Sequence, residues 1–382
     1  MGKLLNITSI MLVSTLSIFM QAAYADDKKF TMAVIGDPQF PWTCKDEGDY
    51  EKFSDYCSYI NRDDKSIDQA KDSNRYAIQE IKQLKNSLGT NFKGLIINGD
   101  LTAFGHPGER EDFNSFYDIK SKDLVIYPGL GNHDYQNNIN KCGGNGVPTH
   151  NRCAGGMMHL MADWVLGYKG LDKGKPRFCD KKLKSCDIAA FNKNFAQRGG
   201  NRNVNGSMAY SWEIGDFLFI QLQNYPHYTA NFKRGYSSGV SSWTMNATSS
   251  MGWLKTQLNE TIDTDKTKGK NVILNMHNIE YYFGLSDQAK KDKADLENLL
   301  KQHSNKIRAV FVGHHHQAIG VDSKFSYGTE IAGIPIIYSG SPISGRFIKA
   351  DFDSSKSEDC IVLTQVNTTI NKSQELRKIQ CS

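Results

Sequence analysis

The sequence has no long run of Lys and Arg residues, and this absence bears on its partners. Among its 382 residues, 46 are Lys or Arg and 41 are Asp or Glu, and the two signs are interspersed along the chain. The formal net charge is +5. Proteins that bind nucleic acids gather basic residues on one face or in one segment. A nucleic-acid-binding surface is therefore not indicated.

Only one apolar stretch approaches the length of a membrane span, and it lies at the N-terminus. It follows the positive charge of Lys3, covers residues 11–20 and precedes Ala23-Tyr24-Ala25, which fits the small-residue rule for signal-peptidase cleavage. The stretch is short for a spanning helix and no second one follows, so an uncleaved membrane anchor is the weaker alternative. We expect a signal peptide over residues 1–25, no membrane span after its cleavage, and a secreted or periplasmic protein.

Cys-x-x-Cys pairs are absent as well, and the eight cysteines lie apart from the histidine clusters. A structural zinc site is therefore the weaker hypothesis. An even number of cysteines in an exported chain favours disulfides. Eight cysteines allow on the order of a hundred connectivities, and pairing in sequence order is the simplest. The predicted bridges are Cys44–Cys57, Cys142–Cys153, Cys179–Cys186 and Cys360–Cys381.

The composition is that of a globular protein. Hydrophobic residues make up 39% and charged residues 23% of the chain, which leaves room for a substantial core. We expect one large domain over residues 26–382. Residues 138–205 interrupt its pattern, because they are rich in Gly, Asn and Lys and hold four cysteines. A segment of this length without clear elements is usually functional or an inserted subdomain. We therefore predict a cysteine-rich insertion at about 138–205.

Five short apolar runs each end at a group of polar residues. The runs are rich in Val, Ile and Phe and are closed by Gly or His, which is typical of buried strands. Helical periodicity between the first three runs, at 66–86 and 108–119, gives an alternating order of strands and helices. An α/β fold is therefore expected. The five predicted strands are 30–35, 93–98, 124–127, 271–276 and 307–312.

Further elements are predicted in the second half of the chain. Two β-rich runs at 207–214 and 217–223 meet at Gly215-Asp216, a strong hairpin signal, and this hairpin is expected to begin a second sheet. Helical periodicity recurs at 251–262, and a shorter helical candidate covers 157–166. The remaining predicted strands are 334–338, 346–352 and 360–366.

The polar groups at the strand ends form an ordered series. Taken singly each is weak, since a Gly-Asp after a strand is most often a turn. Ligands bind at the carboxyl ends of strands in open α/β sheets, so five such groups are expected to converge on one site. The residue types predict a metal centre. The groups are Gly36-Asp37-Pro38-Gln39, Gly99-Asp100, Gly131-Asn132-His133-Asp134, His277, and Gly313-His314-His315-His316.

This series resembles the pattern of the calcineurin-like metallophosphoesterase family: Asp-x-His, Gly-Asp, Gly-Asn-His followed by Asp or Glu, His, and Gly-His-x-His. The resemblance spans roughly residues 31–341 without the insertion, and it extends to Gly252-Trp253-Leu254 and Tyr338-Ser339-Gly340-Ser341. It implies a two-sheet β-sandwich flanked by helices, in αββα layers. It also implies two divalent metal ions that activate water for attack on a phosphate ester.

The resemblance also assigns metal ligands by position. One carboxylate bridges both ions, and neutral imidazole and amide ligands limit the negative charge that faces an anionic substrate. Mixed oxygen and nitrogen ligation suits Mn, Fe or Zn. The implied ligands are Asp37 and His316 on the first metal, Asn132, His277 and His314 on the second, and Asp100 as the bridge.

Three further residues of the series have separate expectations. Gln39 stands where the family has His, and we expect its carbonyl oxygen to ligate the first metal more weakly. The resemblance makes His133 the group that contacts phosphate and protonates the leaving oxygen. Asp134 would orient a neighbouring cation or His133, and a turn-capping role is an equal alternative.

Four residues outside the implied ligand set are candidates for substrate contact. Two follow the predicted hairpin at a strand end, one lies between two implied ligands, and one could clamp a phosphate bidentately or pair with an acid on the sheet. They are Asn224, Tyr225, His315 and Arg346.

The resulting hypothesis is an exported phosphomonoesterase that acts on phosphorylated protein or small metabolites. Residues 37–40, Asp-Pro-Gln-Phe, resemble a branch of the family that includes protein phosphatases. A secreted phosphodiesterase of lipid headgroups or nucleotides is the alternative within the same chemistry. An alternative of another class is a non-catalytic binding protein, in which Gln39 marks the decay of the first metal site.

Overall fold

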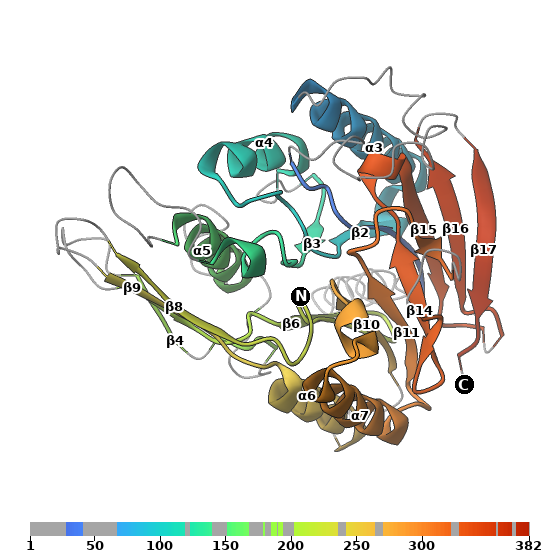
Figure 1. Cartoon of the computed structure of the whole chain (residues 1–382). Coiled ribbons are helices and arrows are strands. Elements are labelled where there is room, and N and C mark those ends of the chain that lie inside the picture. Colours follow the sequence, from blue (N-terminus) through green and yellow to red (C-terminus); the bar gives the residue numbers. More distant parts are fainter. Residues whose placement is uncertain are drawn as a thin grey trace, which may run out of the picture.

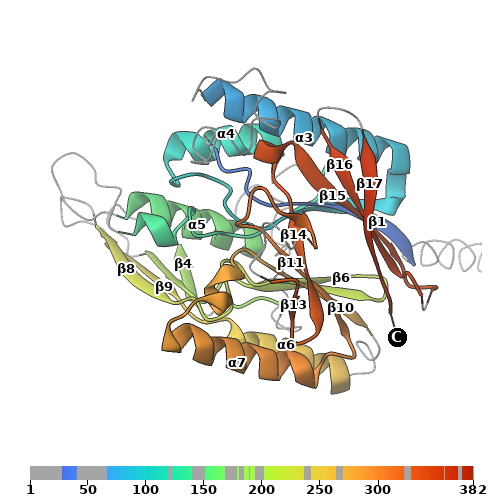
Figure 2. The ribbon, with the colours of Figure 1, turned by 45° about the vertical axis from the view of Figure 1, so that its right-hand side comes forward.

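Two β-sheets pack between two layers of helices in this computed structural model. The described residues are 28–40, 67–118, 123–139, 151–167, 179, 185–188, 190–193, 202–235, 242–263, 270–321, 328–356, 358–368 and 372–381. Helices α3 (Ile67–Leu88) and α4 (Pro107–Tyr117) cover one side, and α6 (Met251–Asp263) and α7 (Asp287–Gln302) cover the other (Figure 1). A view turned by 45° shows the same layers (Figure 2). The expected α/β sandwich flanked by helices is confirmed.

The first sheet brings together strands from both ends of the described chain. It consists of β1 (Lys29–Ile35), β2 (Phe92–Ile97), β3 (Ile126–Pro128), β15 (Arg346–Asp353), β16 (Ile361–Asn367) and β17 (Ser373–Ile379). The order is β17-β16-β15-β1-β2-β3, with β1, β2 and β3 parallel and the other pairs antiparallel. The carboxyl ends of β1 and β2 therefore lie side by side. Each predicted strand in these regions is confirmed, and β3 begins two residues later than the apolar run suggests.

The second sheet is built mainly from the middle of the chain. It contains β6 (Tyr210–Ile214), β7 (Phe217–Gln221), β10 (Asn271–Met276), β11 (Ile307–Val312), β12 (Ile319–Gly320), β13 (Glu330–Ile331) and β14 (Ile334–Ser339). Its order is β12-β14-β11-β10-β7-β6, with β13 paired to β14. Strands β7, β10, β11 and β14 run parallel. The hairpin β6–β7 is confirmed, and it forms the edge of this sheet.

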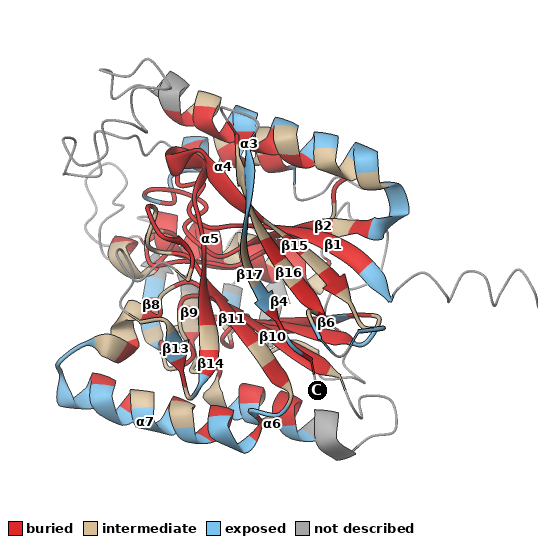
Figure 3. Cartoon of the chain, turned by 90° about the vertical axis from the view of Figure 1, so that its right-hand side faces the viewer, coloured by how far each residue is buried: buried red, intermediate tan, exposed pale blue. Residues whose placement is uncertain are grey.

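The two faces of the second sheet bury different layers of the core. On β10, Val272 and Leu274 belong to a cluster with Leu254 of α6 and Leu296 of α7, whereas Ile273 belongs to the cluster that includes β1. This alternation follows from the two-residue period of a strand. Figure 3 shows buried residues concentrated in the sheets and exposed residues on the outer faces of α3, α6 and α7.

Aromatic side chains join the two sheets. The ring of Phe30 on β1 lies 5.7 Å from that of Phe217 and 6.2 Å from that of Phe219, both on β7. It also stacks on Phe352 of β15 at 4.8 Å. Edge-to-face and stacked rings of this kind add to the stabilisation from burial. The sandwich thereby holds the strand ends of one sheet in a fixed position over those of the other.

A third, four-stranded sheet lies beside the sandwich. It consists of β4 (Ala190–Lys193), β5 (Arg202–Asn205), β8 (Ala230–Gly235) and β9 (Ser242–Ala247), in the order β4-β5-β9-β8. Figure 1 places it at the left, below α5 (Arg152–Leu166). Helix α5 begins five residues before the predicted candidate at 157–166. The predicted insertion thus contains regular elements, and β5 pairs with β9 outside it; its boundaries stay a prediction.

Short 3-10 helices lie at several loops and chain turns near these elements. They are η3 (Gly89–Asn91), η4 (Gln136–Asn138), η5 (Glu280–Phe283) and η6 (Pro342–Ser344). Two of them, η4 and η5, follow strand-end groups of the predicted site. None of the helices in the described ranges has both the length and the apolar character that a bilayer span requires.

Disulfides confirm part of the predicted pairing. Cys179 is bonded to Cys186, and Cys360 is bonded to Cys381. Cys153 is also in a disulfide. Its predicted partner, Cys142, lies outside the described residues. Cys44 and Cys57 of the first predicted bridge and the predicted signal peptide over residues 1–25 also lie outside them.

Candidate metal centre

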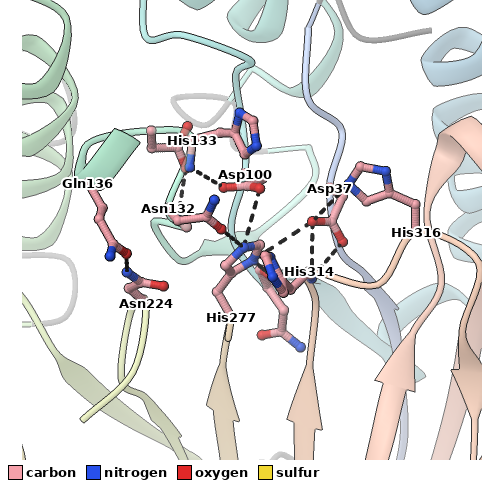
Figure 4. Close-up of polar contacts among 12 residues, drawn as sticks. Asp37, Asp100, Asn132, His133, Gln136, Asn224, His277, His314 and His316 are labelled. Atoms are coloured by element: carbon pink, nitrogen blue, oxygen red, sulfur yellow. Dashed lines mark hydrogen bonds and ion pairs between the residues drawn. The ribbon is translucent and has the colours of Figure 1, made fainter. Parts of the chain in front are cut away.

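The polar groups at the strand ends converge on one site at the open edge between the two sheets. Figure 4 shows carboxylate, amide and imidazole groups from both sheets turned toward one another. Two sets of residues have ligand atoms that all lie within 4.8 Å of one another. The first set is Asp100, His277 and His314, and the second is Asp37, Asp100 and His316.

Asp100 belongs to both sets, as a bridging carboxylate would. Its Oδ2 lies 3.2 Å from Nε2 of His277, which in turn lies 2.8 Å from Oδ1 of Asn132. Asp37 and Asp100 are 0% and 1% exposed. Burying two carboxylates is costly unless a cation or several hydrogen bonds compensate for the lost hydration. The structure brings together the four residues that the sequence predicts for the second metal: Asp100, Asn132, His277 and His314.

The second set draws further residues from the turns that follow β1 and β11. Oδ1 of Asp37 lies 3.6 Å from Nε2 of His316 and 3.8 Å from Nδ1 of His277. Both carboxylate oxygens of Asp37 accept the backbone N–H of His314 at 3.1 Å. The Asp37 carboxylate thus also fixes the turn that carries two of the implied imidazole ligands.

The protonation of His277 gives a direct test of whether a cation fits. Its Nδ1 lies 2.9 Å from the carbonyl oxygen of Asn98, which can only accept, so Nδ1 carries the proton. Burial lowers the pKa of His277, against the opposing effect of Asp100. A neutral ring then has a lone pair on Nε2, and this lone pair faces the oxygens of Asn132 and Asp100. Three acceptors directed at one another are compatible with a shared cation.

The surroundings of Gln39 also fit a bound cation. Its side chain is 0% exposed, and neither Nε2 nor Oε1 has a hydrogen-bond partner among the described residues. Its backbone N–H donates to the Asp100 carbonyl at 2.8 Å, which places the residue next to the implied bridging ligand. A buried amide without a partner costs free energy. Ligation of a metal through Oε1 would remove part of that cost.

The backbone at these groups is unusual. Asp37, Gln39, Asp100 and His314 all have positive φ values, of 55°, 40°, 48° and 71°. Residues other than Gly rarely adopt this left-handed region, and such conformations concentrate at functional sites. Each of these residues lies within four positions of the end of β1, β2 or β11.

Glycines in the same turns let the ligands approach the backbone. A Cβ atom on Gly99 would lie 2.5 Å from Nδ1 of His277, and one on Gly131 would lie 2.2 Å from Oδ1 of Asp100. On Gly313 it would lie 2.2 Å from the carbonyl oxygen of Asn98. Real Cβ atoms do not come this close. The glycines of the three groups are therefore required by contact with the site residues.

His133 lies at the rim of the site. Its backbone N–H donates to Oδ1 of Asp100 at 2.8 Å, and its Nδ1 donates to the Ala103 carbonyl at 2.9 Å. The side chain is only partly buried. Nδ1 is bonded to the backbone, so proton exchange with a substrate would involve Nε2.

Asp134 makes contacts of a different kind. Its carboxylate accepts backbone N–H groups of Gly131, Leu101 and Thr102 at 2.9, 3.0 and 2.9 Å. Burial and the charge of Asp100 raise the pKa of Asp134 to about 8, against these hydrogen bonds. Burial likewise acts to raise the pKa of Asp100, but His277 and the neighbouring histidines bring it well below its usual range. The contacts of Asp134 favour the capping alternative, because they join two ligand-bearing turns.

The four substrate-contact candidates have different surroundings. Asn224 and Tyr225 lie beside the metal-ligand sets, since the carbonyl of Asn224 accepts the backbone N–H of His277 at 3.0 Å. Burial and the neighbouring His314 lower the pKa of His315 to about 4. Arg346 is 8% exposed and donates from Nη2 to the Gln317 carbonyl at 2.7 Å. This contact favours a structural role for Arg346, because Gln317 directly follows the implied ligand His316.

Glu280 is a site residue that sequence reasoning missed. Its Oε2 lies 3.1 Å from Nε2 of His314 and 3.6 Å from Nε2 of His315. A carboxylate that accepts the outer N–H of a ligating histidine fixes the ring and its tautomer. No motif carries this residue. A polar residue three positions after a ligand, in the turn that begins η5, is the only sequence signal.

Comparisons with known proteins give only distant similarities. No protein-family model and no curated protein match the chain. A dimetal phosphatase from Danio rerio is 12% identical, with a TM-score of 0.45 over 91% of this chain and 99% of that one. The sulfate thiohydrolase SoxB from Thermus thermophilus is 11% identical, with a TM-score of 0.43 over 92% and 58%. Both TM-scores lie below 0.5.

Proposed function

We propose that this chain is a metal-dependent hydrolase of phosphate esters. One observation carries the proposal: Oδ1 of Asn132 and Oδ2 of Asp100 lie 2.8 and 3.2 Å from Nε2 of His277, whose Nδ1 is bonded to the Asn98 carbonyl. A second set around Asp37 and His316 shares Asp100. Two cation sites with a common carboxylate are the arrangement that two-metal hydrolysis requires.

The proposed ligands are those expected from the sequence. Asp37, Gln39, Asp100 and His316 would hold the first ion, and Asp100, Asn132, His277 and His314 the second. The mixed oxygen and nitrogen donors suit Mn, Fe or Zn. Two bound divalent ions would supply the nucleophile at neutral pH and offset the charge that develops on the phosphoryl oxygens.

His133 is proposed as the general acid. The hydrogen bond from Nδ1 to the Ala103 carbonyl fixes the ring orientation. Nε2 would then hold the proton that the leaving oxygen takes up as its bond to phosphorus breaks. Because the His133 N–H also binds Asp100, the acid and the bridging carboxylate have a fixed spacing. Asp134 would maintain that spacing, because its carboxylate binds backbone N–H groups in the turns that carry His133 and Asp100.

We propose phosphomonoesters as the substrate, as expected from the sequence. A phosphodiesterase would use the same metal ligands, because substrate choice lies in the surrounding loops. A binding protein with a decayed site would have no need for a buried Gln39 side chain without a partner among the described residues, or for four residues in strained backbone conformations at one place. Export is part of the proposal, and disulfides at Cys179–Cys186 and Cys360–Cys381 support it because they persist in oxidising compartments.

The test combines metal analysis with two chromogenic esters. Protein purified without chelators is expected to contain close to two equivalents of transition metal and to hydrolyse p-nitrophenyl phosphate faster than bis(p-nitrophenyl) phosphate. The reverse preference would favour the diesterase. Asp100→Asn is expected to lose both metal and turnover. Fewer than one equivalent of metal with no turnover of either ester would instead support the binding protein.

A further inference from the structure

A cavity opens directly beside the proposed metal ligands. Its volume is about 450 Å³, and His314 forms part of its wall. We call it the tyrosine pocket. Its remaining lining residues are Gln136, Tyr225, Asn278, Glu280, Tyr281, Gly284, Leu285, Ser286 and Ala289. Because His314 belongs to both the pocket and the metal site, an ester held at the metals would extend its organic group into this space.

Two tyrosines give the pocket a rigid aromatic wall. The rings of Tyr225 and Tyr281 stack at 4.1 Å with an interplanar angle of 14°. The hydroxyl of Tyr281 donates to Oδ2 of Asp292 at 2.5 Å, and Gln288 donates to the other oxygen of that carboxylate at 2.7 Å. Charge-assisted hydrogen bonds of this length fix both groups. The wall is therefore formed before any ligand arrives.

The charge of the pocket is opposite to that of a phosphate site. Glu280 is its one acidic lining residue, and the described lining residues include no Lys or Arg. The Glu280 side chain is 36% exposed and therefore accessible from the pocket. Leu285, which is 88% exposed, adds an apolar rim. Aromatic rings, a carboxylate and apolar groups together are the surroundings that favour a methylated ammonium ion.

Asn224 provides an independent sign that a ligand belongs here. It is 0% exposed, and its Nδ2 donates to Oε1 of Gln136, a lining residue, at 2.6 Å. Its Oδ1 has no hydrogen-bond partner within the described ranges. Figure 4 shows this oxygen directed toward the metal-ligand side chains rather than toward Gln136. The residue contacts both Gln136 of the pocket wall and the backbone of the implied ligand His277, and a buried acceptor there suits contact with a bound molecule.

We propose that the tyrosine pocket binds the quaternary ammonium group of a phosphorylated amino alcohol whose phosphate lies at the metals. This proposal rests on the proposed function and names its substrate class. Water would form the new bond to phosphorus, the ester P–O bond would break, and the leaving oxygen would take a proton from His133. The products are inorganic phosphate and the free amino alcohol.

Two esters of the same shape test the charge preference. Choline phosphate carries a trimethylammonium group, and 3,3-dimethylbutyl phosphate carries the neutral tert-butyl group in its place. We expect kcat/KM to be at least about tenfold higher for choline phosphate, the ratio that a desolvated cation–π contact gives. The phosphate is the same in both esters, but the trimethylammonium group also makes the leaving alcohol more acidic. The share of the ratio that belongs to the pocket is therefore the share that pocket variants remove.

Variants then locate the preference. Tyr281→Leu and Glu280→Gln are each expected to lower the ratio of the two kcat/KM values severalfold. The second variant keeps the shape of the side chain, so it serves where the first one fails to fold. Tyr76→Leu removes a tyrosine that is 42% exposed on α3, and it is expected to leave the ratio unchanged. Metal content is measured for each variant, because Glu280 also contacts His314.

The outcomes separate this inference from the proposed function. Equal kcat/KM values for the two esters, with p-nitrophenyl phosphate still hydrolysed, would overturn the ammonium pocket and leave the hydrolase standing. A ratio that persists in both Tyr281→Leu and Glu280→Gln would overturn the placement in this pocket. Absence of hydrolysis of all three esters by metal-loaded protein would overturn the proposed function itself.

Discussion

At the scale of single residues, the site is defined by polar atoms whose neighbours do not satisfy them. Nε2 of His277 faces two oxygens, and Gln39 has a buried amide without a partner among the described residues. Buried polar groups in folded proteins are almost always hydrogen-bonded. When several exceptions meet at one place, a missing ligand explains them together. Here the donor types point to divalent cations rather than to a water molecule.

His133 gives the first prediction at this scale. His133→Ala is expected to lower kcat for an alkyl phosphate by about a hundred- to ten-thousandfold, the usual contribution of a general acid. Metal content is expected to stay the same, because the hydrogen bond from His133 to Asp100 comes from the backbone N–H, which Ala keeps. The loss with p-nitrophenyl phosphate is expected to be much smaller, since that leaving group needs little protonation. Steady-state kinetics with both esters measures the difference.

The control for His133 is a histidine in a neighbouring loop. The side chain of His106 is 53% exposed and pairs with Glu109. His106→Ala is expected to leave kcat unchanged for both esters. Losses of equal size for the alkyl and the aryl ester in His133→Ala would contradict the general-acid role.

Gln39 gives the second prediction. Gln39→Ala is expected to weaken the first metal by at least about 10- to 100-fold, the loss seen even for partners one step further from a metal. Gln39→His is expected to retain two ions and to hold the first more tightly, because imidazole is the more basic ligand. Elemental analysis after dialysis against graded metal concentrations measures both.

A second buried glutamine provides the matched control. Gln221 is also 0% exposed and has no described hydrogen-bond partner for its amide, but it lies against Gly129. Gln221→Ala is expected to keep both ions. Its change in stability measures the effect of removing a buried amide that binds no metal, and this effect can be subtracted from that of Gln39→Ala. If Gln39→Ala retained two equivalents and normal turnover, position 39 would not be a ligand.

Sequence and structure agree unevenly at the residue scale. Asp37, Asp100 and His277 could be predicted because each closes an apolar strand, and strand ends of one sheet edge must meet. Glu280 could not, because its contact with His314 depends on how the η5 turn is placed across 34 positions. The capping role of Asp134 could be weighed but not chosen, since it depends on which N–H groups the folded turns present.

At the scale of elements, the turns that follow the strands provide the implied ligands of the site. Four implied ligands have positive φ, and glycines in the same groups contact ligand side chains. Neither feature stabilises the fold by itself. The buried sheets on either side must hold these turns in place, which is why the site lies at the edge of the core rather than on a free loop.

Gly99 gives the prediction at this scale. Gly99→Ala is expected to lower the free energy of unfolding by roughly 1–3 kcal/mol, because φ is +83° and the new Cβ would lie 2.5 Å from Nδ1 of His277. Displacement of that ring would also remove the second metal. Urea unfolding and metal analysis of the same sample measure the two effects.

A helical glycine serves as the control. Nothing lies within 4 Å of a Cβ placed on Gly252 in α6, so Gly252→Ala is expected to stabilise the protein by about 0.5–1 kcal/mol. An unchanged metal content and unchanged stability in Gly99→Ala would show that the turn can relax. The close approach of backbone and imidazole would then not be required.

Two elements that sequence analysis did not predict, α7 and β17, share a physical reason. Helix α7 begins with seven residues of which only Ala289 is apolar, and its buried leucines gather in its second half. Strand β17 is an exposed edge in which only Ile379 is buried. Both depend on a neighbouring element: β17 pairs with the edge of β16, and the buried leucines of α7 pack with apolar residues of the second sheet. Periodicity could not reveal elements that depend on such partners.

At the scale of the whole molecule, the proposed ions connect the two sheets. Asp37 and Asp100 follow β1 and β2 of the first sheet, while His277 and His314 follow β10 and β11 of the second. The aromatic contacts between Phe30 and Phe219 join the sheets through the core. Bound cations would join them again at the strand ends. Metal binding and folding are therefore expected to be coupled.

Metal removal gives the prediction at this scale. An ion that binds only the folded state stabilises it by about 2.7 kcal/mol when its free concentration is a hundred times Kd. We expect a chelator to lower the Tm, and added Mn²⁺ to restore it with a rise that continues with the logarithm of the free ion concentration. Differential scanning calorimetry at several Mn²⁺ concentrations measures this dependence.

Asp100→Asn distinguishes coupling through the site from nonspecific effects of the ion. The variant retains the shape of the shared ligand but removes its charge, so its Tm is expected to respond little to chelator or Mn²⁺. The intact protein and the variant would then converge in Tm once the metal is removed. If the intact protein lost all its metal without a change in Tm, the ions could not connect the sheets. The ligands would in that case lie on turns that are rigid without them.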